Sequence, residues 1–418
     1  MNFSIYKKSR EEIADIQLKK MRKVVSVAYE KSDFYHNLYK NSDFHPDMLK
    51  TYEDIQKIPI AKRSTIKSTP VESIVTRHDF GKLHLHTTSG SSGIPVKFYY
   101  TGMEDLKKNY GVLRAYLTMG MKLTDRTIAL RDPCDITKPT LYQKMGIVAY
   151  DYYNIYNPVE ENYRLICEKY DTIDILKGMP SDLINLCYAI RKENMRFPKV
   201  RLLFSDSEVL DDFSRKFITD TIGTEILDFY ASVENGCIAF QLPGSKKYFL
   251  NEDMVLVENG NGDAQIGDAV ITNLRNTTFP IIRYQIGDVI EFGDGKSDVQ
   301  GMNFKTIDKI QGKYLDFIVL PDKTIISPHV PKQEMTYIKG IKRFQVHQKE
   351  IDRITVVIER DVDYSENEEN MIIEKLEHAF KNQIKCTVVY DDQLSIKTKN
   401  KFKCIQSDVA QQFLTDNM

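Results

Sequence analysis

The first feature that could do chemistry is a short stretch of small, hydroxylated residues, TTSGSSGIP at 87–95. The chain has only 20 glycines among 418 residues, yet two of them fall here. Glycine lets consecutive backbone N–H groups approach an anion, and the hydroxyl groups add donors. The candidate anion-binding residues are Thr88, Ser89, Gly90, Ser91, Ser92 and Gly93. The same composition is typical of a surface turn, and the stretch lacks the Gly-Lys-[Ser/Thr] ending of a Walker P-loop, so both interpretations stay open.

Two carboxylates stand beside turns. Glu234 lies in DFYASVENG (228–236) with Tyr230 and Ser232, and its oxygens could hold a hard cation such as Mg²⁺. Asp288 follows a glycine in FPIIRYQIGD (279–288), which reads as the end of an apolar strand, where a carboxylate can accept hydrogen bonds from a sugar diol. Taken alone, each of these carboxylates could also be an ordinary acidic residue at a strand end or in a turn, without a binding role.

Two basic stretches come later in the chain. Lys313 lies in GKYLD (312–316), and KTKNKFK (397–403) places its lysines at alternate positions, so that all four would share one face of an extended strand. The second stretch is either a solvated basic tail or the source of a lysine that brings a mobile point charge to a phosphate.

The composition excludes several classes of protein. The 58 basic and 59 acidic residues nearly balance, so we expect no nucleic-acid partner. The six cysteines are scattered without a CxxC pair, which argues against structural zinc and disulfides. The N-terminus lacks the apolar core of a signal peptide, and no run reaches the roughly 18 apolar residues of a membrane span. We therefore expect a soluble, cytoplasmic protein.

The elements that position these residues alternate along the middle of the chain. Residues 9–40 have helical spacing, and a polar helical segment follows near 51–57. Short apolar strands at 127–131 and 200–205 then alternate with helices at 159–169 and 181–194. This alternation predicts an α/β layered architecture with some parallel sheet.

The pattern changes towards the end of the chain. Residues 248–320 read as β-strands separated by turns, and the last hundred residues read as a small α+β unit with a helix at 365–382 and a final strand CTVVYDD. A boundary near 308–313 predicts an N-terminal domain of residues 1–310 and a C-terminal domain of residues 311–418.

The order of the motifs is more specific than any one of them. A Ser/Thr/Gly loop, Tyr-x-Ser-x-Glu, Arg-Tyr-x-x-Gly-Asp, Gly-[Arg/Lys]-x-x-Asp and a C-terminal lysine follow one another here. This succession resembles that of the adenylate-forming (acyl/aryl-CoA synthetase) superfamily. KSDFYHNLY (31–39) and IQKIPIAKRSTIK (55–67) look like parts of its phenylacetate-CoA ligase branch, which includes relatives encoded with capsule and surface-polysaccharide genes.

The resemblance implies a fold and an activity. It implies a large multi-sheet α/β domain, 1–310, that binds ATP and the acyl substrate, and a small mobile α+β domain, 311–418, that carries a catalytic lysine. The implied activity is ATP- and Mg²⁺-dependent adenylation of a small carboxylate, followed by acyl transfer to a thiol, most simply coenzyme A. The oligomeric state stays open, a dimer included.

The resemblance also implies a role for each candidate residue. The loop 88–93 would grip the β- and γ-phosphates of ATP. Tyr230 would contact adenine, within the same nucleotide-binding motif as Ser232, and Glu234 would bind Mg²⁺ and take part in catalysis. Asp288 and Lys313 would bind the ribose. The catalytic Lys401 would neutralise charge at the α-phosphate.

The chain departs from the family pattern at several positions. Ile94 stands where many loops have lysine, and Lys313 replaces an arginine and cannot present a bidentate fork. Asn400 stands where glycine is usual, which leaves Lys399 and Lys403 as rivals of Lys401. Leu315 fills a hinge position that is often acidic, and Ala231 occupies a common glycine position.

These departures keep two alternatives open. The adenylated group could pass to a hydroxyl or an amine in cofactor or surface-polysaccharide biosynthesis, or the protein could bind a nucleotide without catalysis. The acid itself is not named by the sequence. Its pocket is expected in a tyrosine-rich region, formed by Tyr142, Tyr150, Tyr152, Tyr153 and Tyr156.

Overall fold

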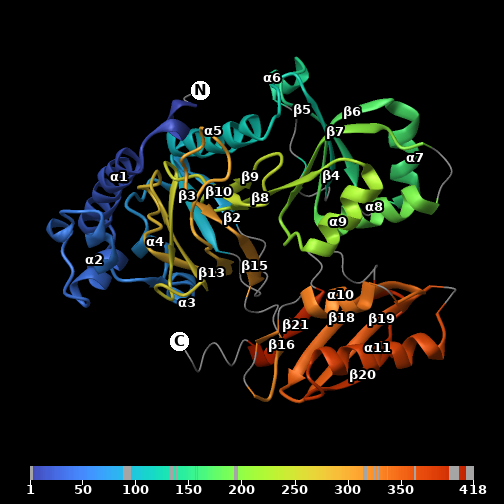
Figure 1. Ribbon diagram of the computed structural model, residues 1–418. Coiled ribbons are helices and arrows are strands. Elements are labelled where there is room, and N and C mark those ends of the chain that lie inside the picture. Colours follow the sequence, from blue (N-terminus) through green and yellow to red (C-terminus); the bar gives the residue numbers. More distant parts are fainter. Residues whose placement is uncertain are drawn as a thin grey trace. The chain divides into compact units, whose positions relative to one another are not determined.

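Apolar runs in the middle of the chain form the strands of an eight-stranded sheet (Figure 1). The computed structural model describes residues 3–87, 96–131, 136, 140–155, 157, 159–192, 196–313, 318–322, 325–326, 329–336, 338–361, 364–394 and 404–410. Across the sheet the strands are β14 (Thr306–Ile307), β10 (Tyr248–Leu250), β9 (Gly236–Gln241), β8 (Ile226–Ser232), β7 (Lys199–Asp206), β6 (Thr172–Gly178), β4 (Arg126–Arg131) and β5 (Ala149–Asn154).

Five neighbouring strands of this sheet, β8, β7, β6, β4 and β5, run parallel. Strand β9 returns antiparallel beside β8, and β10 and β14 continue antiparallel. Parallel strands need crossover connections, and helices α7 (Val159–Lys169), α8 (Pro180–Lys192) and α9 (Asp212–Ile222) supply them. The predicted helices at 159–169 and 181–194 are thus confirmed, and the parallel strands end at one edge of the sheet.

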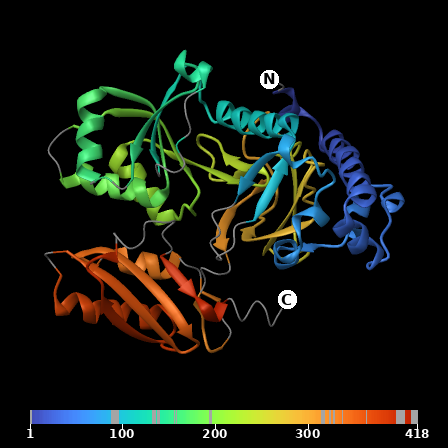
Figure 2. The ribbon, with the colours of Figure 1, turned by 180° about the vertical axis from the view of Figure 1, so that it is seen from behind.

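Each face of the eight-stranded sheet has its own apolar core. Helices α7, α8 and α9 cover one face, where Leu176, Leu203 and Ile226 of adjacent strands are buried. Helix α5 (Gly102–Thr118) covers the other face through Ala115, Tyr116 and the following Met119. Figure 2 shows α5 from behind, with the short helix α6 (Leu141–Lys144) beyond it. Both faces are therefore buried, as parallel strands require.

A second sheet packs against the N-terminal helices. Its strands are β1 (Ala61–Lys62), β13 (Tyr284–Glu291), β12 (Ile266–Asn273) and β11 (Val255–Asn259), with β15 (Lys309–Lys313) also paired to β13. Its core includes residues of α1 (Arg10–Lys31), α2 (Asp33–Lys40), α3 (Arg63–Ser68) and α4 (Val71–Ile74). Strands β2 (His84–Thr87) and β3 (Lys97–Tyr100) form a separate hairpin. The 3₁₀ helices are Ser4–Lys7, Pro46–Met48, Glu53–Lys57 and Phe80–Lys82.

The sequence-based predictions missed a break in one helix and placed the end of one strand too early. The predicted helix 9–40 is two helices, because Ser32 ends α1 and accepts a hydrogen bond from the Tyr35 N–H at the start of α2. Asp288 was expected at the end of a strand, but β13 continues past it to Glu291. Gly287 has φ +87°, a conformation that glycine adopts without strain, so the glycine does not end the strand.

The chain forms two compact units. One contains residues 1–286 and 290–310, and the other contains residues 287–289 and 311–418. In the second unit a four-stranded sheet has the order β20 (Lys385–Tyr390), β19 (Arg353–Arg360), β18 (Ile341–Glu350) and β21 (Ile405–Ser407). Helices α10 (His329–Thr336) and α11 (Glu366–Ala379) and the pair β16 (Ile318–Val319) and β17 (Ile325–Ile326) complete it. None of the helices in the described part of the chain is long and apolar enough to cross a bilayer.

Candidate functional site

The β8–β9 turn carries three of the predicted site residues. Tyr230 and Ser232 lie on β8, where Ser232 pairs with Gly236 of β9, and Glu234 lies in the turn between the strands. Glu234 is buried, with 2% of its surface exposed. Gly236 has φ +70°, and a Cβ atom there would lie 2.7 Å from Cγ of Lys108 on α5. Glycine at this position therefore lets α5 approach the turn closely.

The backbone of this turn is held by side chains from other elements. The Tyr100 hydroxyl lies 2.9 Å from the carbonyl oxygen of Glu234 and 3.1 Å from that of Val233. Asn273 at the end of β12 donates from Nδ2 to the same Glu234 oxygen at 2.9 Å. Burial and the nearby Glu234 carboxylate raise the pKa of Tyr100, so its hydroxyl stays a donor at neutral pH. The turn is thus fixed before any ligand binds.

A charged group on α5 faces the same turn. Lys108 Nζ lies 4.3 Å from the centroid of the Tyr100 ring and 3.4 Å from Oδ1 of Asp105. Burial lowers the pKa of Lys108, and the carboxylates of Asp105 and Glu234 oppose that shift. The cation and the Glu234 carboxylate therefore lie close enough to influence each other.

The hairpin that leads into the predicted phosphate loop is attached to α5 at this point. His84 Nδ1 lies 2.9 Å and His86 Nε2 lies 3.1 Å from the carboxylate of Asp105. Burial and the neighbouring Lys108 lower the pKa of His86, which keeps it neutral at pH 7. Strand β2 ends at Thr87, which pairs with Lys97 of β3. Thr88, Ser89, Gly90, Ser91, Ser92 and Gly93 lie outside the described residues.

The other predicted site residues are only partly described. Asp288 is buried within β13, next to β15. Lys313 closes β15, and only its backbone is described. Lys401 lies outside the described residues, as do its rivals Lys399 and Lys403, Asn400 and the hinge position Leu315. The structure thus brings together Tyr230, Ser232 and Glu234 and leaves the roles of all the candidates as predictions.

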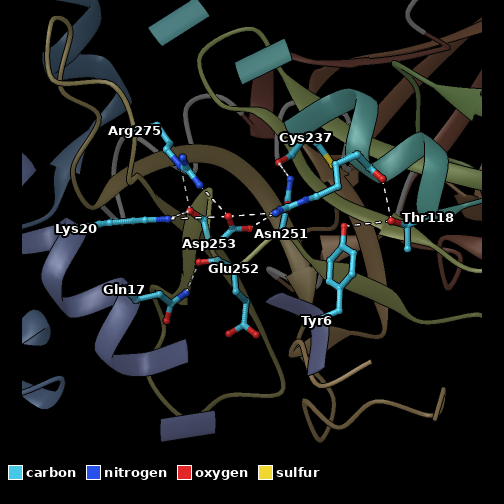
Figure 3. Close-up of polar contacts among 10 residues, drawn as sticks. Tyr6, Gln17, Lys20, Thr118, Cys237, Asn251, Glu252, Asp253 and Arg275 are labelled. Atoms are coloured by element: carbon cyan, nitrogen blue, oxygen red, sulfur yellow. Dashed lines mark hydrogen bonds and ion pairs between the residues drawn. The ribbon is translucent and has the colours of Figure 1, made fainter. Parts of the chain in front are cut away.

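A buried ionic cluster ties helix α5 to the elements around the turn (Figure 3). We call it the tether cluster; it consists of Arg114, Asp253, Asn251, Lys20 and Arg275. Arg114 donates to Asn251 Oδ1 at 2.6 Å and to both carboxylate oxygens of Asp253, and Arg275 reaches the same carboxylate at 2.8 Å. Lys20 donates to the Asp253 carbonyl oxygen, and burial with the nearby Arg275 lowers its pKa to about 8.

The tether cluster connects strand β9, which follows the Glu234 turn, to helix α5. Asn251 donates from Nδ2 to the carbonyl oxygen of Cys237 on β9 at 3.3 Å, while Arg114 lies on α5. Burial opposes the charge of Asp253, but Arg114 outweighs it and holds the pKa of the carboxyl below its usual range. Helix α5 and the strand after Glu234 are thereby fixed to each other.

Sequence analysis missed a second buried ionic cluster, at the ends of parallel strands. We call it the strand-end cluster; it consists of Lys177, Asp206, Arg131 and Tyr116. Lys177 Nζ and Arg131 Nη2 each lie 2.8 Å from Oδ2 of Asp206, and Lys177 also donates to the Tyr116 hydroxyl. A charged residue at the end of each apolar run, in TIALR, DILKG and LLFSD, was the available signal.

The expected tyrosine region lies partly at the edge strand beside this cluster. Tyr150 and Tyr152 on β5 are partly buried, and their rings stack with centroids 5.5 Å apart. Tyr153 is buried on the opposite face, and Tyr142 is 67% exposed. Tyr156 lies outside the described residues.

The fold of this chain is similar to that of adenylate-forming CoA ligases. The structure of 2-hydroxyisobutyryl-CoA ligase with R3-HIB-AMP aligns with a TM-score of 0.76 at 15% identity and covers 99% of this chain and 93% of that one. The anthranilate CoA ligase AuaEII with anthranoyl-AMP aligns with a TM-score of 0.53 at 13% identity, over 80% and 66% of the two chains. The predicted fold class is confirmed.

Sequence comparison leads to particular relatives. The chain is 24% identical to Protein CapK of Staphylococcus aureus over 371 residues, which are 84% of this chain and 80% of CapK. It is 20% identical to the phenylacetate-coenzyme A ligase of Pseudomonas putida over 88% and 87% of the two chains. Residues 318–408 match the CapK C-terminal domain family. The resemblance to the phenylacetate-CoA ligase branch is therefore confirmed, and the structural neighbours are adenylate-forming CoA ligases.

Proposed function

We propose that this protein is an ATP- and Mg²⁺-dependent ligase that adenylates a small carboxylate and passes the acyl group to a thiol, most simply coenzyme A. The observation that carries the proposal is the buried Glu234 turn, preset by Tyr100 and Asn273 on a fold of the adenylate-forming type. Since ATP and coenzyme A are cytoplasmic metabolites, we propose that the protein acts in the cytoplasm.

The proposed chemistry is two displacements. A carboxylate oxygen of the acid attacks the α-phosphorus of ATP, the bond from that phosphorus to the bridging oxygen breaks, and pyrophosphate leaves. The thiol sulfur then attacks the acyl carbon, AMP leaves with the original carboxylate oxygen, and the thiol proton is released to solvent. Positioned cations lower the barrier of the first step because negative charge accumulates around the α-phosphorus.

Each candidate residue has a place in this scheme as a proposal. In the N-terminal domain, 1–310, the loop Thr88–Gly93 would bind the β- and γ-phosphates and Tyr230 and Ser232 would line the adenine site. Asp288 and Lys313 would bind the ribose. Lys401, in the C-terminal domain 311–418, would neutralise charge at the α-phosphate, and rotation of that domain would admit the acceptor.

Glu234 fits the proposed metal. In the described part of the chain no three His, Cys, Asp or Glu side chains are grouped to hold a metal ion. Mg²⁺ commonly takes only one or two protein carboxylates and completes its shell with phosphate oxygens and water, so a single buried carboxylate is a suitable donor set. When bound, the ion would neutralise phosphate charge, while Tyr100 and Asn273 keep the Glu234 backbone in place.

ATP–pyrophosphate exchange tests the first half-reaction. A panel of aryl, short-chain, amino and sugar carboxylates is assayed with wild type and Lys401→Ala, with Lys399→Ala and Lys403→Ala as matched controls. We expect exchange with at least one acid and a loss of about 10²–10³ in rate for Lys401→Ala only. If no acid supports exchange in a protein that still binds ATP, the proposal is wrong and a non-catalytic nucleotide-binding role is favoured.

A second candidate keeps adenylation and changes the acceptor to a hydroxyl or an amine, as in surface-polysaccharide biosynthesis. It is favoured by the match of residues 318–408 to the CapK C-terminal domain family, since the C-terminal domain would serve the second half-reaction. Consumption of coenzyme A with formation of a thioester supports the first candidate. An ester or amide product without coenzyme A consumption supports the second.

A further inference from the structure

The strand-end cluster lies on one face of the parallel sheet. In the strand register, Ala129 of β4 lies opposite both Tyr152 of β5 and Lys177 of β6. Lys177 in turn lies opposite Phe204 of β7. Residues that are paired across strands point to the same face of the sheet, so these four side chains share one face. Asp206, two residues after Phe204, shares that face and pairs with Phe229, the residue before Tyr230. The cluster is therefore one strand away from the β8 segment that leads to Glu234.

The ion pairs of this cluster are not needed to join the elements that carry them. Strands β4, β6 and β7 are already hydrogen-bonded neighbours in parallel register. Burying an ion pair costs desolvation that its attraction often fails to offset, and an apolar replacement is frequently as stable. Yet Lys177 and Asp206 are each only 7% exposed. The charges therefore call for an explanation other than holding the strands together.

The chemistry of the cluster favours an anion. Lys177 and Arg131 both pair with the carboxylate of Asp206, so two cations share one carboxylate among the described members of the cluster. Burial opposes the charge of Lys177, but the Asp206 carboxylate outweighs it and raises the pKa, so the ammonium persists at neutral pH. The Tyr116 ring stacks on Phe229 with centroids 4.4 Å apart, which fixes its hydroxyl beside the ammonium.

The position of the cluster is suited to a ligand. Ligands of open α/β sheets bind beyond the carboxyl ends of the strands, and Arg131 and Asp206 are the last residues of β4 and β7. Ser207, which follows Asp206, has φ +69°, an uncommon conformation for a residue other than glycine; strained residues of this kind often cluster at active sites. The Arg131 side chain is 23% exposed, so solvent reaches this member of the cluster.

We propose that the strand-end cluster binds a second anionic group at the far end of the acyl substrate. The substrate would then be an acid that carries a carboxylate or phosphate besides the carboxylate that is adenylated, with its middle lying against Tyr150 and Tyr152. This inference rests on the proposed adenylation and names its substrate class.

The test measures ATP–pyrophosphate exchange with two sets of acids. The first set has matched length and consists of butanoate, succinate and 3-phosphonopropanoate. The second compares phenylacetate with 4-carboxyphenylacetate. Wild type is expected to prefer the acids with a second anion. Lys177→Met and the more exposed Arg131→Gln are expected to lower kcat/KM for those acids about 30-fold or more, because a buried charge pair is lost, and to change it little for the others. Lys169→Met is the matched control, since Lys169 pairs with Asp151 3.1 Å away and is 57% exposed.

The outcomes separate this inference from the proposed function. The inference is overturned if wild type prefers butanoate and phenylacetate. It is also overturned if Lys177→Met and Arg131→Gln lower kcat/KM equally for acids with and without a second anion. Either result leaves the proposed adenylation intact. If no acid supports exchange, thermal shift with succinate and butanoate decides. Stabilisation by succinate that is lost in Lys177→Met supports the anion site without adenylation, and its absence in wild type overturns the anion site too.

Discussion

The two buried ionic clusters of the larger unit differ in what they connect. The tether cluster joins residues far apart in the chain, Lys20, Arg114 and Asp253, through donors that end on internal acceptors. The ion pairs of the strand-end cluster join strands of one sheet that are already paired through their backbones. The charges of the two clusters therefore have different roles in our account. Those of the tether cluster hold the fold together, whereas those of the strand-end cluster are proposed to bind a ligand at the carboxyl ends of the strands.

If the tether cluster holds the fold, loss of its central arginine should destabilise the protein strongly. Arg114→Met leaves Asp253 buried without its main partner and is expected to lower the free energy of unfolding by about 3–5 kcal/mol. Urea unfolding followed by far-ultraviolet circular dichroism measures this. Lys8→Met, which removes the exposed pair with Glu12, is the control, with an expected change of at most about 1 kcal/mol. A loss no larger in Arg114→Met than in the control would contradict the assignment.

Glu104 is a buried carboxylate that accepts hydrogen bonds, in contrast to the ion-paired carboxylates of the two clusters. Glu104 Oε1 accepts hydrogen bonds from the Thr277 and Thr278 N–H groups at 2.8 and 3.2 Å, and Oε2 accepts one from the Thr101 N–H at 2.8 Å. Burial opposes its charge, but these bonds outweigh burial and lower its pKa. Glu104→Gln leaves a buried donor unsatisfied and is expected to cost about 2 kcal/mol at pH 7.

The sign of the pH dependence follows from that lowered pKa. The contribution of Glu104 is fully present above the pKa of the unfolded chain, about 4.5, and is lost as pH falls through the lower folded value. The stability gap between wild type and Glu104→Gln should therefore shrink below about pH 4.5. Glu12→Gln, in the exposed capping box of α1, is the matched control. A gap that stays constant from pH 7 to 3 would show that the fold does not lower the pKa of Glu104.

The double variant Lys177→Met/Asp206→Asn separates binding from stability. Both buried charges are removed together, so no carboxylate is left without a partner, and unfolding is expected within about 1 kcal/mol of wild type. Selectivity for succinate over butanoate in exchange is nevertheless expected to disappear. A double variant as unstable as Arg114→Met would assign both clusters to the fold and remove the distinction between them.

The smallest expected effect concerns the neutral contacts of the Glu234 turn. Tyr100→Phe removes the hydroxyl that reaches the carbonyl oxygens of Val233 and Glu234 and is expected to cost about 1 kcal/mol. The exchange rate should fall with it, since the turn is less well fixed. Tyr39→Phe is the matched control: its buried hydroxyl has no partner among the described residues, so the change should be neutral or stabilising. Equal effects of the two variants would argue against a positioning role for Tyr100.

Sequence patterns predicted the elements better than the contacts between them. Strands at 127–131 and 200–205 and helices at 159–169 and 181–194 follow from local periodicity, and the structure has them. The proximity of Tyr230, Ser232 and Glu234 could be predicted because these residues are contiguous in the sequence, whereas their roles stay predictions. Lys177, Asp206 and Arg131 each stand at the end of an apolar run, but their grouping was missed. The order of the strands that brings them together is set by packing on both sheet faces, and no local pattern encodes that order.

Oxygen labelling tests the proposed adenylation most directly. The protein is incubated with ATP, Mg²⁺, a thiol acceptor and an acid whose carboxylate carries ¹⁸O, and the AMP formed is examined by mass spectrometry. Attack of the carboxylate on the α-phosphorus transfers one labelled oxygen to AMP, so we predict singly labelled AMP in step with product formation. Label in inorganic phosphate with release of ADP, or product formation with unlabelled AMP, would contradict carboxylate adenylation.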